Sequence, residues 1–549
     1  MKEFRDLTTL VIDPNSSMRA SMHNMLNLCE ITKVDHAVSA GTAIRPLQNK
    51  NYDLILCEYD LADGQDGQQL LEDLRHNKLI PMRTIFIMVT AERSYERVVS
   101  AAELAPTDYL LKPFTADALL ERIMRAVEKR AAFMSVYQLM DHGSLNDAAA
   151  ACVEGEATYP RYANEFLRLR AELHVMLGQP AEAETIYNRL LENRAVAWAR
   201  LGLGKTLFMQ DRFGEAEALL ASLVADNPKF LDAYDWLAKA HEAADQLPQA
   251  KDVLKNAVAI SPHAVRRLRK LGQVALETGD VETAEQSFQK VVSKAKYSEF
   301  RDPEDHVRLV KTLVKKGDTR QAAMVVRDLE KSLGGQEKTP ACRAIASALI
   351  HESEGDAERA AEEFLAAVAA CRSSTGLSSE IKIGLAKSCL ENNLEQGASE
   401  IMLDVMNNAA GDAVMGKATK MFKDAGRPDL AESVARQSRR QVVEMVSSGA
   451  DKARQGDFQG AVTLMTEAAC KLPENPQVVF NAAIAALKCL EHLGWDIRLA
   501  EQARWYIENS RRLDPTNPRL LPLTELYQTV LKKYGILPGQ VMAKPPTRT

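Results

Sequence analysis

The sequence predicts two architectures in one chain, a doubly wound α/β sheet domain at the start and an all-α array of helix pairs after it. Two observations predict this division. Short apolar runs alternate with helix-like stretches up to about residue 128, and from residue 143 onward a Gly, Asp or Asn is repeatedly followed, five positions later, by Ala. A chain of 549 residues is also several times the usual domain length.

Composition narrows the class of protein. Hydrophobic residues make up 46% and charged residues 26%, as in ordinary packed proteins. A net charge of −6 argues against a general nucleic-acid binder. The first residues hold no long apolar segment and no run of 18 apolar residues follows, so we expect a cytoplasmic protein without a membrane span. The cysteines form no CxxC pair, so we expect no metal centre.

The sheet is predicted from four short apolar runs separated in part by stretches of helical periodicity. The runs are residues 8–12, 53–57, 84–89 and 108–111. Such alternation is typical of a parallel sheet with helices on both faces. In a doubly wound sheet the chemistry lies beyond the carboxyl ends of the strands, so the residues there are the candidate site.

The strand ends carry Asp13, Glu58, Thr90 and Lys112, the last within "DYLLKPF". This set resembles the response-regulator receiver family. The resemblance implies a five-stranded sheet in which Asp13 is an acid of the pocket, Glu58 stands at the phospho-acceptor position and Thr90 is the switch hydroxyl. It further implies that Lys112 is the phosphate-contacting lysine, that Tyr109 is the aromatic switch residue, and that a sensor kinase or other signalling protein is the receiver's partner.

The sequence departs from the family pattern at two positions. Pro14 replaces the second acid after the first strand, which removes a carboxylate ligand for Mg²⁺. We therefore expect no cofactor, and Mg²⁺ held by Asp13 and Glu58 only weakly if at all. Glu58 replaces the aspartate, and its longer side chain can reach Lys112 and Thr90, the groups that a phosphate contacts in activated relatives.

Three interpretations of Glu58 stay open on the sequence alone. It can be a built-in, partial mimic of activation, partial because a carboxylate has less charge and fewer acceptor oxygens than a phosphoryl group. The receiver can instead be a folded docking or dimerisation block with a decayed site. In the third interpretation Glu58 or the nearby Asp60 still accepts phosphate and gates the helical array.

The array is predicted from ten turn residues, each followed five positions later by an alanine. The turn residues are Gly143, Gly178, Asp211, Asp245, Gly279, Gly317, Gly355, Asn393, Gly426 and Gly456. The alanines are Ala148, Ala183, Ala216, Ala250, Ala284, Ala322, Ala360, Ala398, Ala431 and Ala461. Gly, Asn and Asp tolerate the left-handed backbone that ends a helix, and a small alanine lets two helices approach closely. Successive alanines are 30 to 38 residues apart, which indicates tetratricopeptide repeats.

Residues 234–262 resemble the tetratricopeptide family motif most clearly. From this resemblance we expect a superhelical solenoid of about ten to eleven helix pairs over residues 129–517, after a receiver over 1–128. A capping helix is expected at 518–535 and a disordered tail at 536–549. No Pro- or Gly-rich linker interrupts residues 116–142, so the last receiver helix is expected to continue into the repeats.

The inner groove of the best repeats is predicted to bind a protein segment. Its candidate residues are Arg168, Trp198, Lys205, Asp235, Lys239, Arg266 and Arg269. The repeats use up the chain after the receiver, so no catalytic output domain and no enzymatic activity are expected. The sequence therefore predicts a bacterial signalling adaptor that binds proteins through the groove. The alternatives are a phosphorylation-gated response regulator and a structural, homodimeric scaffold.

Overall fold

The computed structural model describes the chain except residues 1–3, 62–65, 78, 92–105, 142, 194–195, 263, 296–300, 375, 410, 516, 537–540, 542 and 547–549. The chain forms two compact units. The first comprises residues 1–141, 145–175 and 179–312, and the second comprises residues 142–144, 176–178 and 313–549.

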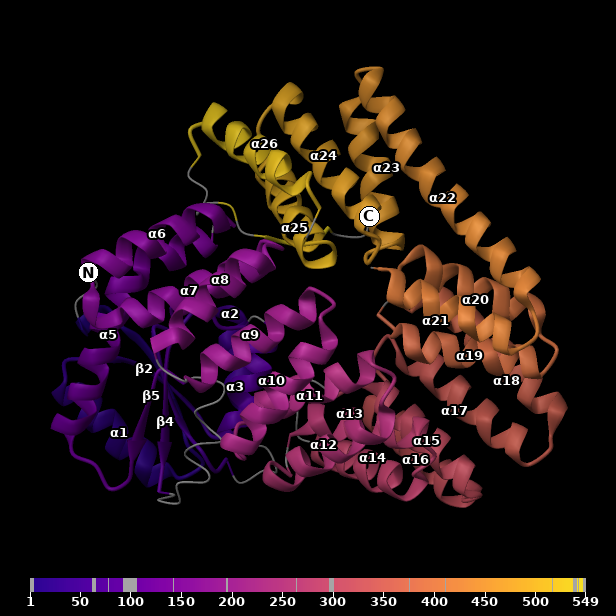
Figure 1. The fold of residues 1–549 in the computed structure, drawn as a ribbon, viewed down its shortest axis with the longest axis horizontal. Helices are drawn as coiled ribbons and strands as arrows, with labels where there is room; N and C mark the ends of the chain where they lie inside the picture. The colour runs from indigo at the N-terminus through magenta and orange to yellow at the C-terminus, as the bar shows by residue number, and fades with distance from the viewer. Residues whose placement is uncertain are drawn as a thin grey trace. The chain divides into compact units, whose positions relative to one another are not determined.

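The first unit begins with a five-stranded parallel sheet. Its strands are β1 (Thr8–Ile12), β2 (Lys33–Ala37), β3 (Leu54–Glu58), β4 (Ile85–Thr90) and β5 (Asp108–Leu111). Their order is β2-β1-β3-β4-β5, and every pairing is parallel. Figure 1 shows this sheet in the indigo to violet part of the chain. This confirms the predicted doubly wound α/β domain.

Helices cover both faces of the sheet because its strands are apolar on both sides. On one face α1 (Ser16–Leu28) and the start of α5 (Ala116–Asp141) pack on a buried cluster. On the other face α2 (Ala40–Asn49) and α3 (Gly67–His76) pack on a second cluster. The carboxyl ends of the strands are left free to carry the site.

Helix α5 runs without a break from the sheet domain into the repeats, as the missing linker predicts. Its Arg130 donates to Asp53 Oδ1 at 3.3 Å, just before β3. Its Phe133 stacks on Phe166, with ring centroids 3.9 Å apart. One helix therefore belongs to the cores of both the sheet domain and the first repeat.

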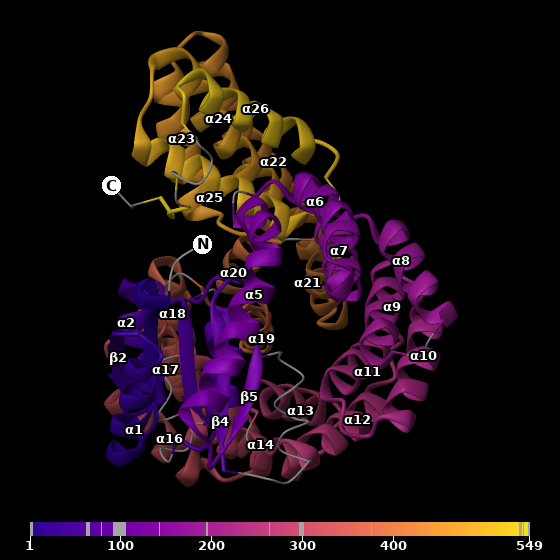
Figure 2. The same ribbon diagram turned by 90° about the vertical axis from the view of Figure 1, so that its left-hand side faces the viewer.

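The repeats of the first unit are antiparallel helix pairs that follow one another along a curve (Figure 2). They comprise α6 (Leu145–Thr158), α7 (Ala163–Met176), α8 (Pro180–Asn193), α9 (Ala197–Met209), α10 (Phe213–Asp226), α11 (Leu231–Ala243), α12 (Leu247–Ile260), α13 (Val265–Glu277), α14 (Val281–Ala295) and α15 (Pro303–Lys316), whose last turn lies in the second unit.

The second unit continues the helical array. It comprises α16 (Thr319–Leu333), α17 (Thr339–Ser353), α18 (Ala357–Ser373), α19 (Ser379–Glu391), α20 (Glu395–Asn407), α21 (Asp412–Asp424), α22 (Pro428–Arg454), α23 (Phe458–Lys471), α24 (Pro476–Leu493), α25 (Ile497–Leu513) and α26 (Leu520–Lys533). Helix α22 is 27 residues long and serves two successive pairs, which explains why the alanine spacing is shortest there.

The turn residues and the alanines that predicted the array both have the local structure expected of them. All ten turn residues have positive φ, between 58° and 84°. All ten alanines are at most 3% exposed. The predicted all-α solenoid is confirmed, whereas the domain limits at residues 128 and 517 stay predictions.

The C-terminal tail, expected to be disordered, packs in part. Val541 is fully buried in the core cluster of α23 to α26. Lys544 forms an ion pair with Glu501 of α25 at 2.8 Å. An apolar side chain and a counter-charge hold these two residues, and the disorder expected over 536–549 stays a prediction.

Candidate functional site

The receiver residues converge at the carboxyl edge of the sheet. Asp13 follows β1, Glu58 ends β3, Thr90 ends β4 and Lys112 follows β5. Asp13, Thr90 and Glu58 are 1%, 4% and 8% exposed. Tyr109 lies inside β5, opposite Met88 of β4. The sheet thus brings four side chains from four strands to one buried pocket.

Lys112 lies between the two carboxylates of this pocket. Its ammonium donates to Asp13 Oδ2 at 3.0 Å and to Glu58 Oε2. Burial opposes the charge of Lys112, but the hydrogen bonds to Glu58 and then Asp13 outweigh it and raise the pKa of Lys112 above its ordinary value. The pocket therefore holds a standing ion pair between the residues at the acceptor and lysine positions.

The remaining carboxylate oxygens bind the backbone. Glu58 Oε1 accepts from the N–H groups of Tyr59 and Asp60, at 2.9 and 3.3 Å. Asp13 Oδ1 accepts from the Asn15 N–H at 2.8 Å. Each oxygen of the two acids thus has a donor from the chain itself, which fixes the Glu58 side chain inside the pocket.

This donor set does not fit Mg²⁺, the cation that receivers use. Pro14 contributes no carboxylate, and the oxygens of Asp13 and Glu58 already accept hydrogen bonds. Mg²⁺ requires near-octahedral oxygen ligands and would have to displace the Lys112 ammonium. Arg19 also donates to the carbonyls of Asp13 and Pro14, at 2.6 and 2.9 Å, and so occupies the loop after β1.

The backbone of Thr90 is hydrogen-bonded to the backbone of Lys112. The Thr90 carbonyl accepts from the Lys112 N–H at 2.8 Å, which places Thr90 beside the Glu58–Lys112 ion pair. The predicted hydrogen bond from the Thr90 hydroxyl to Glu58 stays a prediction, as do the switch roles of Thr90 and Tyr109.

The predicted groove residues lie on the first helices of successive pairs. Arg168 is on α7, Trp198 and Lys205 on α9, Asp235 and Lys239 on α11, and Arg266 and Arg269 on α13. Several of them bind one another or nearby residues. The Arg168 guanidinium lies 5.5 Å from the Trp198 ring centroid, and Arg168 also pairs with Glu172 at 2.9 Å.

Two of the predicted groove residues are committed to internal ion pairs. Arg269 binds both oxygens of Asp305 on α15, at 2.6 and 2.7 Å, where Asp305 is 1% exposed. Asp235 accepts a bidentate bond from Arg267, at 2.9 and 3.0 Å. Their contribution is therefore to hold adjacent repeats together.

Trp236 contacts two of the predicted groove residues, and the sequence did not single it out. It lies on α11, with the ammonium groups of Lys239 and Lys205 at 4.0 and 5.6 Å from its ring centroid. The sequence does hold a signal for it: Trp236 stands three positions before the predicted groove residue Lys239, and residues three apart lie on the same face of a helix.

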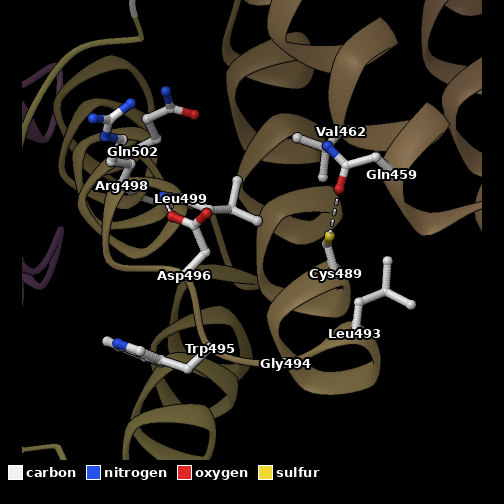
Figure 3. A pocket seen from close by; sticks show the side chains of 10 residues that line it. All are labelled: Gln459, Val462, Cys489, Leu493, Gly494, Trp495, Asp496, Arg498, Leu499 and Gln502. Atoms are coloured by element: carbon white, nitrogen blue, oxygen red, sulfur yellow. Dashed lines mark hydrogen bonds between the residues drawn. The ribbon is translucent and has the colours of Figure 1, made fainter.

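The second unit has a cleft of about 440 Å³ between α23, α24 and α25, lined among others by Gln459, Cys489 and Trp495 (Figure 3). The Cys489 thiol donates to Gln459 Oε1 at 3.6 Å. Burial and then Asp496 raise the pKa of this thiol, which disfavours the thiolate that nucleophilic chemistry needs. Nowhere in the described ranges do three or more Cys, His, Asp or Glu side chains gather as metal ligands.

None of the helices within the described residues is both long and apolar enough to cross a bilayer.

The comparisons with known proteins match two successive parts of the chain, the sheet domain and the repeats that follow it. The family model of the response regulator receiver domain matches residues 9–124, and that of the tetratricopeptide repeat matches residues 168–230, 201–264 and 237–299. Chemotaxis protein CheY of Pseudomonas aeruginosa is 30% identical over 120 residues, which is 22% of this chain and 95% of the relative. Chemotaxis protein CheY-3 of Vibrio cholerae is 26% identical over 125 residues, 23% of this chain and 95% of the relative.

A tetratricopeptide repeat protein from Parabacteroides merdae is similar at 16% identity and a TM-score of 0.32, over 49% of this chain and 97% of that one, values too low to carry an argument. The sheet order, the pocket and the 30% identity to a relative covered almost completely give one conclusion: the chain belongs to the response-regulator receiver family, with tetratricopeptide repeats following the receiver domain.

Proposed function

We propose that this chain is a bacterial signalling adaptor in which Glu58 is a permanent anion at the acceptor position of a pseudo-receiver, and the repeats bind partner proteins. A receiver domain followed by tetratricopeptide repeats indicates a signalling protein with a protein-interaction region. The proposal adds the state of the pocket and the adaptor role.

The ion pair between Glu58 and Lys112 supports this proposal most strongly. In relatives the lysine at this position contacts the phosphoryl group, whereas here a side chain of the chain itself satisfies it. Lys112 is only 15% exposed, so the pair is shielded from water and from salt. An incoming phosphoryl group would have to displace a buried, charge-assisted hydrogen bond.

The mimicry is partial. A carboxylate carries one negative charge and two acceptor oxygens, whereas a phosphorylated side chain carries about −1.5 to −2 charges and three. Glu58 therefore supplies the contact to Lys112 and two backbone contacts, but less charge than a phosphoryl group would.

Helix α5 supplies a route from the pocket domain to the repeats. Asp53, which precedes the strand that ends in Glu58, binds Arg130 of α5, and Phe133 one turn later packs on α7. We place the adaptor in the bacterial cytoplasm, with a sensor kinase or another signalling protein at the receiver and a homodimer as a further assembly.

Intact-mass analysis after incubation with acetyl phosphate and Mg²⁺ tests the pocket. The wild-type chain is expected to stay unmodified. The matched control is the double variant Pro14→Asp with Glu58→Asp, which restores the family's acidic pair and acceptor and is expected to gain one phosphoryl group. Stoichiometric labelling of the wild-type chain at Glu58 or Asp60, located by peptide mapping, would establish the phosphorylation-gated alternative instead.

Hydrogen exchange then separates mimicry from a decayed site. Glu58→Gln removes the anion, so altered protection along α5 and α7 is expected if the anion sets the state of the repeats. Unchanged protection outside the pocket would leave the receiver as a docking or dimerisation block.

A further inference from the structure

Three of the predicted groove residues form, together with Trp236, a surface that we call the cationic patch, made of Lys205, Trp236, Lys239 and Arg266. These residues come from three successive first helices, α9, α11 and α13. Lys205 and Lys239 lie over the Trp236 ring, 5.6 and 4.0 Å from its centroid. The Phe208 ring meets Trp236 edge-on at 5.5 Å and so holds the indole in place.

The charges around the patch are neutralised, whereas those of the patch are not. Arg267 pairs with Asp235 at 2.9 Å, Lys270 with Glu242 at 2.5 Å and Arg269 with Asp305 at 2.6 Å. Within the part of the chain that the structure describes, Lys205, Lys239 and Arg266 have no carboxylate at ion-pair distance. Lys239 and Arg266 are also exposed to solvent.

The pKa of Lys239 agrees with a patch whose positive charges are not neutralised. Its pKa is lowered, first by burial of its stem and then by Arg266, Lys205 and Lys270, although Asp235 acts in the opposite direction. Acids do face this region: Asp232 lies on α11 beside Lys205, and Glu72 of α3 is within electrostatic range of Arg266. Neither forms an ion pair with the patch.

We propose that the cationic patch is the site where the groove binds an acidic segment of a partner protein, with partner carboxylates bridging Lys205, Lys239 and Arg266. This inference rests on the adaptor function proposed above and specifies the chemical class of its partner. Binding would replace the mutual repulsion of three cations by charge-assisted hydrogen bonds.

A nucleic-acid strand fits this surface less well. Single strands bind to aromatic side chains whose ring faces are open for base stacking. The Trp236 face is covered by the Lys239 ammonium at 4.0 Å, and the chain as a whole is acidic. A carboxylate can reach the ammonium groups without displacing them from the ring.

The test uses the full-length chain and a fluorescein-labelled hexaglutamate peptide, with binding followed by fluorescence anisotropy at low salt. Hexaglutamine, hexalysine and a short oligothymidine serve as comparison probes. One variant carries the single substitution Lys239→Glu. The double variant carries Lys205→Glu and Lys239→Glu together. The matched control is Lys420→Glu on α21, a charge reversal at an exposed lysine of the second unit.

Hexaglutamate is expected to bind best of the four probes, and more weakly as salt rises. Its affinity should fall at least tenfold in Lys239→Glu and further in the double variant, and stay within about twofold in Lys420→Glu. No binding of hexaglutamate, equal loss in all three variants, or stronger binding of any comparison probe would overturn the proposal. Circular dichroism melting curves verify that the variants are folded.

Failure of this proposal can be told apart from failure of the adaptor function. If a protein captured from lysate by the repeats binds equally to the double variant and to wild type, the adaptor function stands and the patch is not its site. If hexaglutamate binds the patch as expected but no protein is captured, the acidic chemistry of the patch stands and the adaptor function fails.

Discussion

Phe133 of α5 and Phe166 of α7 stack with their ring centroids 3.9 Å apart and their planes 16° from parallel. Both rings are buried, Phe133 at 2% and Phe166 at 0% exposure. Gly155 of α6 makes room for them, since a Cβ there would lie 2.4 Å from the Phe166 ring. The first repeat is therefore built around a side chain carried by the last helix of the receiver.

Replacing Phe133 with alanine should uncouple the receiver from the repeats. Removal of a buried phenyl ring typically costs about 3–5 kcal/mol, and here the loss falls at the junction. We expect thermal unfolding to split into separate transitions of the two parts in calorimetry. The control is Tyr159→Ala, whose ring is 42% exposed and lies 6.3 Å from Phe166. Equal effects of the two substitutions would contradict this role of Phe133.

Removing the anion of the pocket should destabilise the receiver. Glu58→Gln leaves the partly buried Lys112 with Asp13 as its one carboxylate partner among the described residues, and loss of a charged hydrogen-bond partner costs about 1–3 kcal/mol. The folded pKa of Lys112 is raised, so this stabilisation is present at neutral pH and is lost only as alkaline pH rises through that pKa.

The control for this prediction is Glu30→Gln, which breaks an ion pair with Arg5 between side chains that are 62% and 68% exposed. A fully exposed ion pair is screened by solvent and contributes little to stability, so this variant should melt close to wild type at pH 7. A Glu58→Gln variant as stable as Glu30→Gln would show that the buried pair adds nothing.

Glu72 should make the stability of the first unit depend on pH between about 4.5 and 7. Burial raises the pKa of Glu72 to about 7, against the influence of Arg267 and Arg266 and with a further rise from Asp66 and Asp73. Because the folded state then binds the proton more tightly than the unfolded state does, stability falls as pH rises through this window.

Glu72→Gln removes this dependence. We expect its melting temperature to exceed that of wild type by about 2–4 °C at pH 8 and to match it near pH 4.5. Glu154→Gln, at an exposed position on α6, is the control and should follow the wild-type curve. A variant that is less stable than wild type at pH 8 would mean that Arg266 and Arg267 outweigh burial.

The parts of this fold that could be predicted are those set by local sequence. A left-handed backbone needs Gly, Asn or Asp, so all ten turn residues could be found, and close helix packing needs a small residue, so all ten alanines could be placed. Strand β2 was not found from an apolar run because it lies at the sheet edge, where only Ala37 of its five residues is buried.

Contacts between residues far apart in the sequence could not be predicted from local sequence. Asp13, Glu58, Thr90 and Lys112 could be placed together because all four stand at or just after the ends of parallel strands. Arg269 could not be distinguished from Arg266, because its partner Asp305 is 36 residues away on another helix. Which of these cations forms an internal ion pair depends on how the repeats stack, so the contacts of the predicted Lys205 and Lys239 with Trp236 emerged only from the structure.

Two glycines on helices should respond to alanine with opposite signs. A Cβ at Gly272 of α13 would lie 2.8 Å from ring carbons of Phe288, which is fully buried and cannot move away. Overpacking of this kind costs about 1–3 kcal/mol, more than the roughly 1 kcal/mol that alanine gains in a helix. At Gly416 of α21 nothing lies within 4 Å of a Cβ, so Gly416→Ala should stabilise by about 0.5–1 kcal/mol. Urea unfolding of the two variants measures both values. The same sign for both would mean that helix propensity, and not the close approach of α13 to Phe288, explains glycine at position 272.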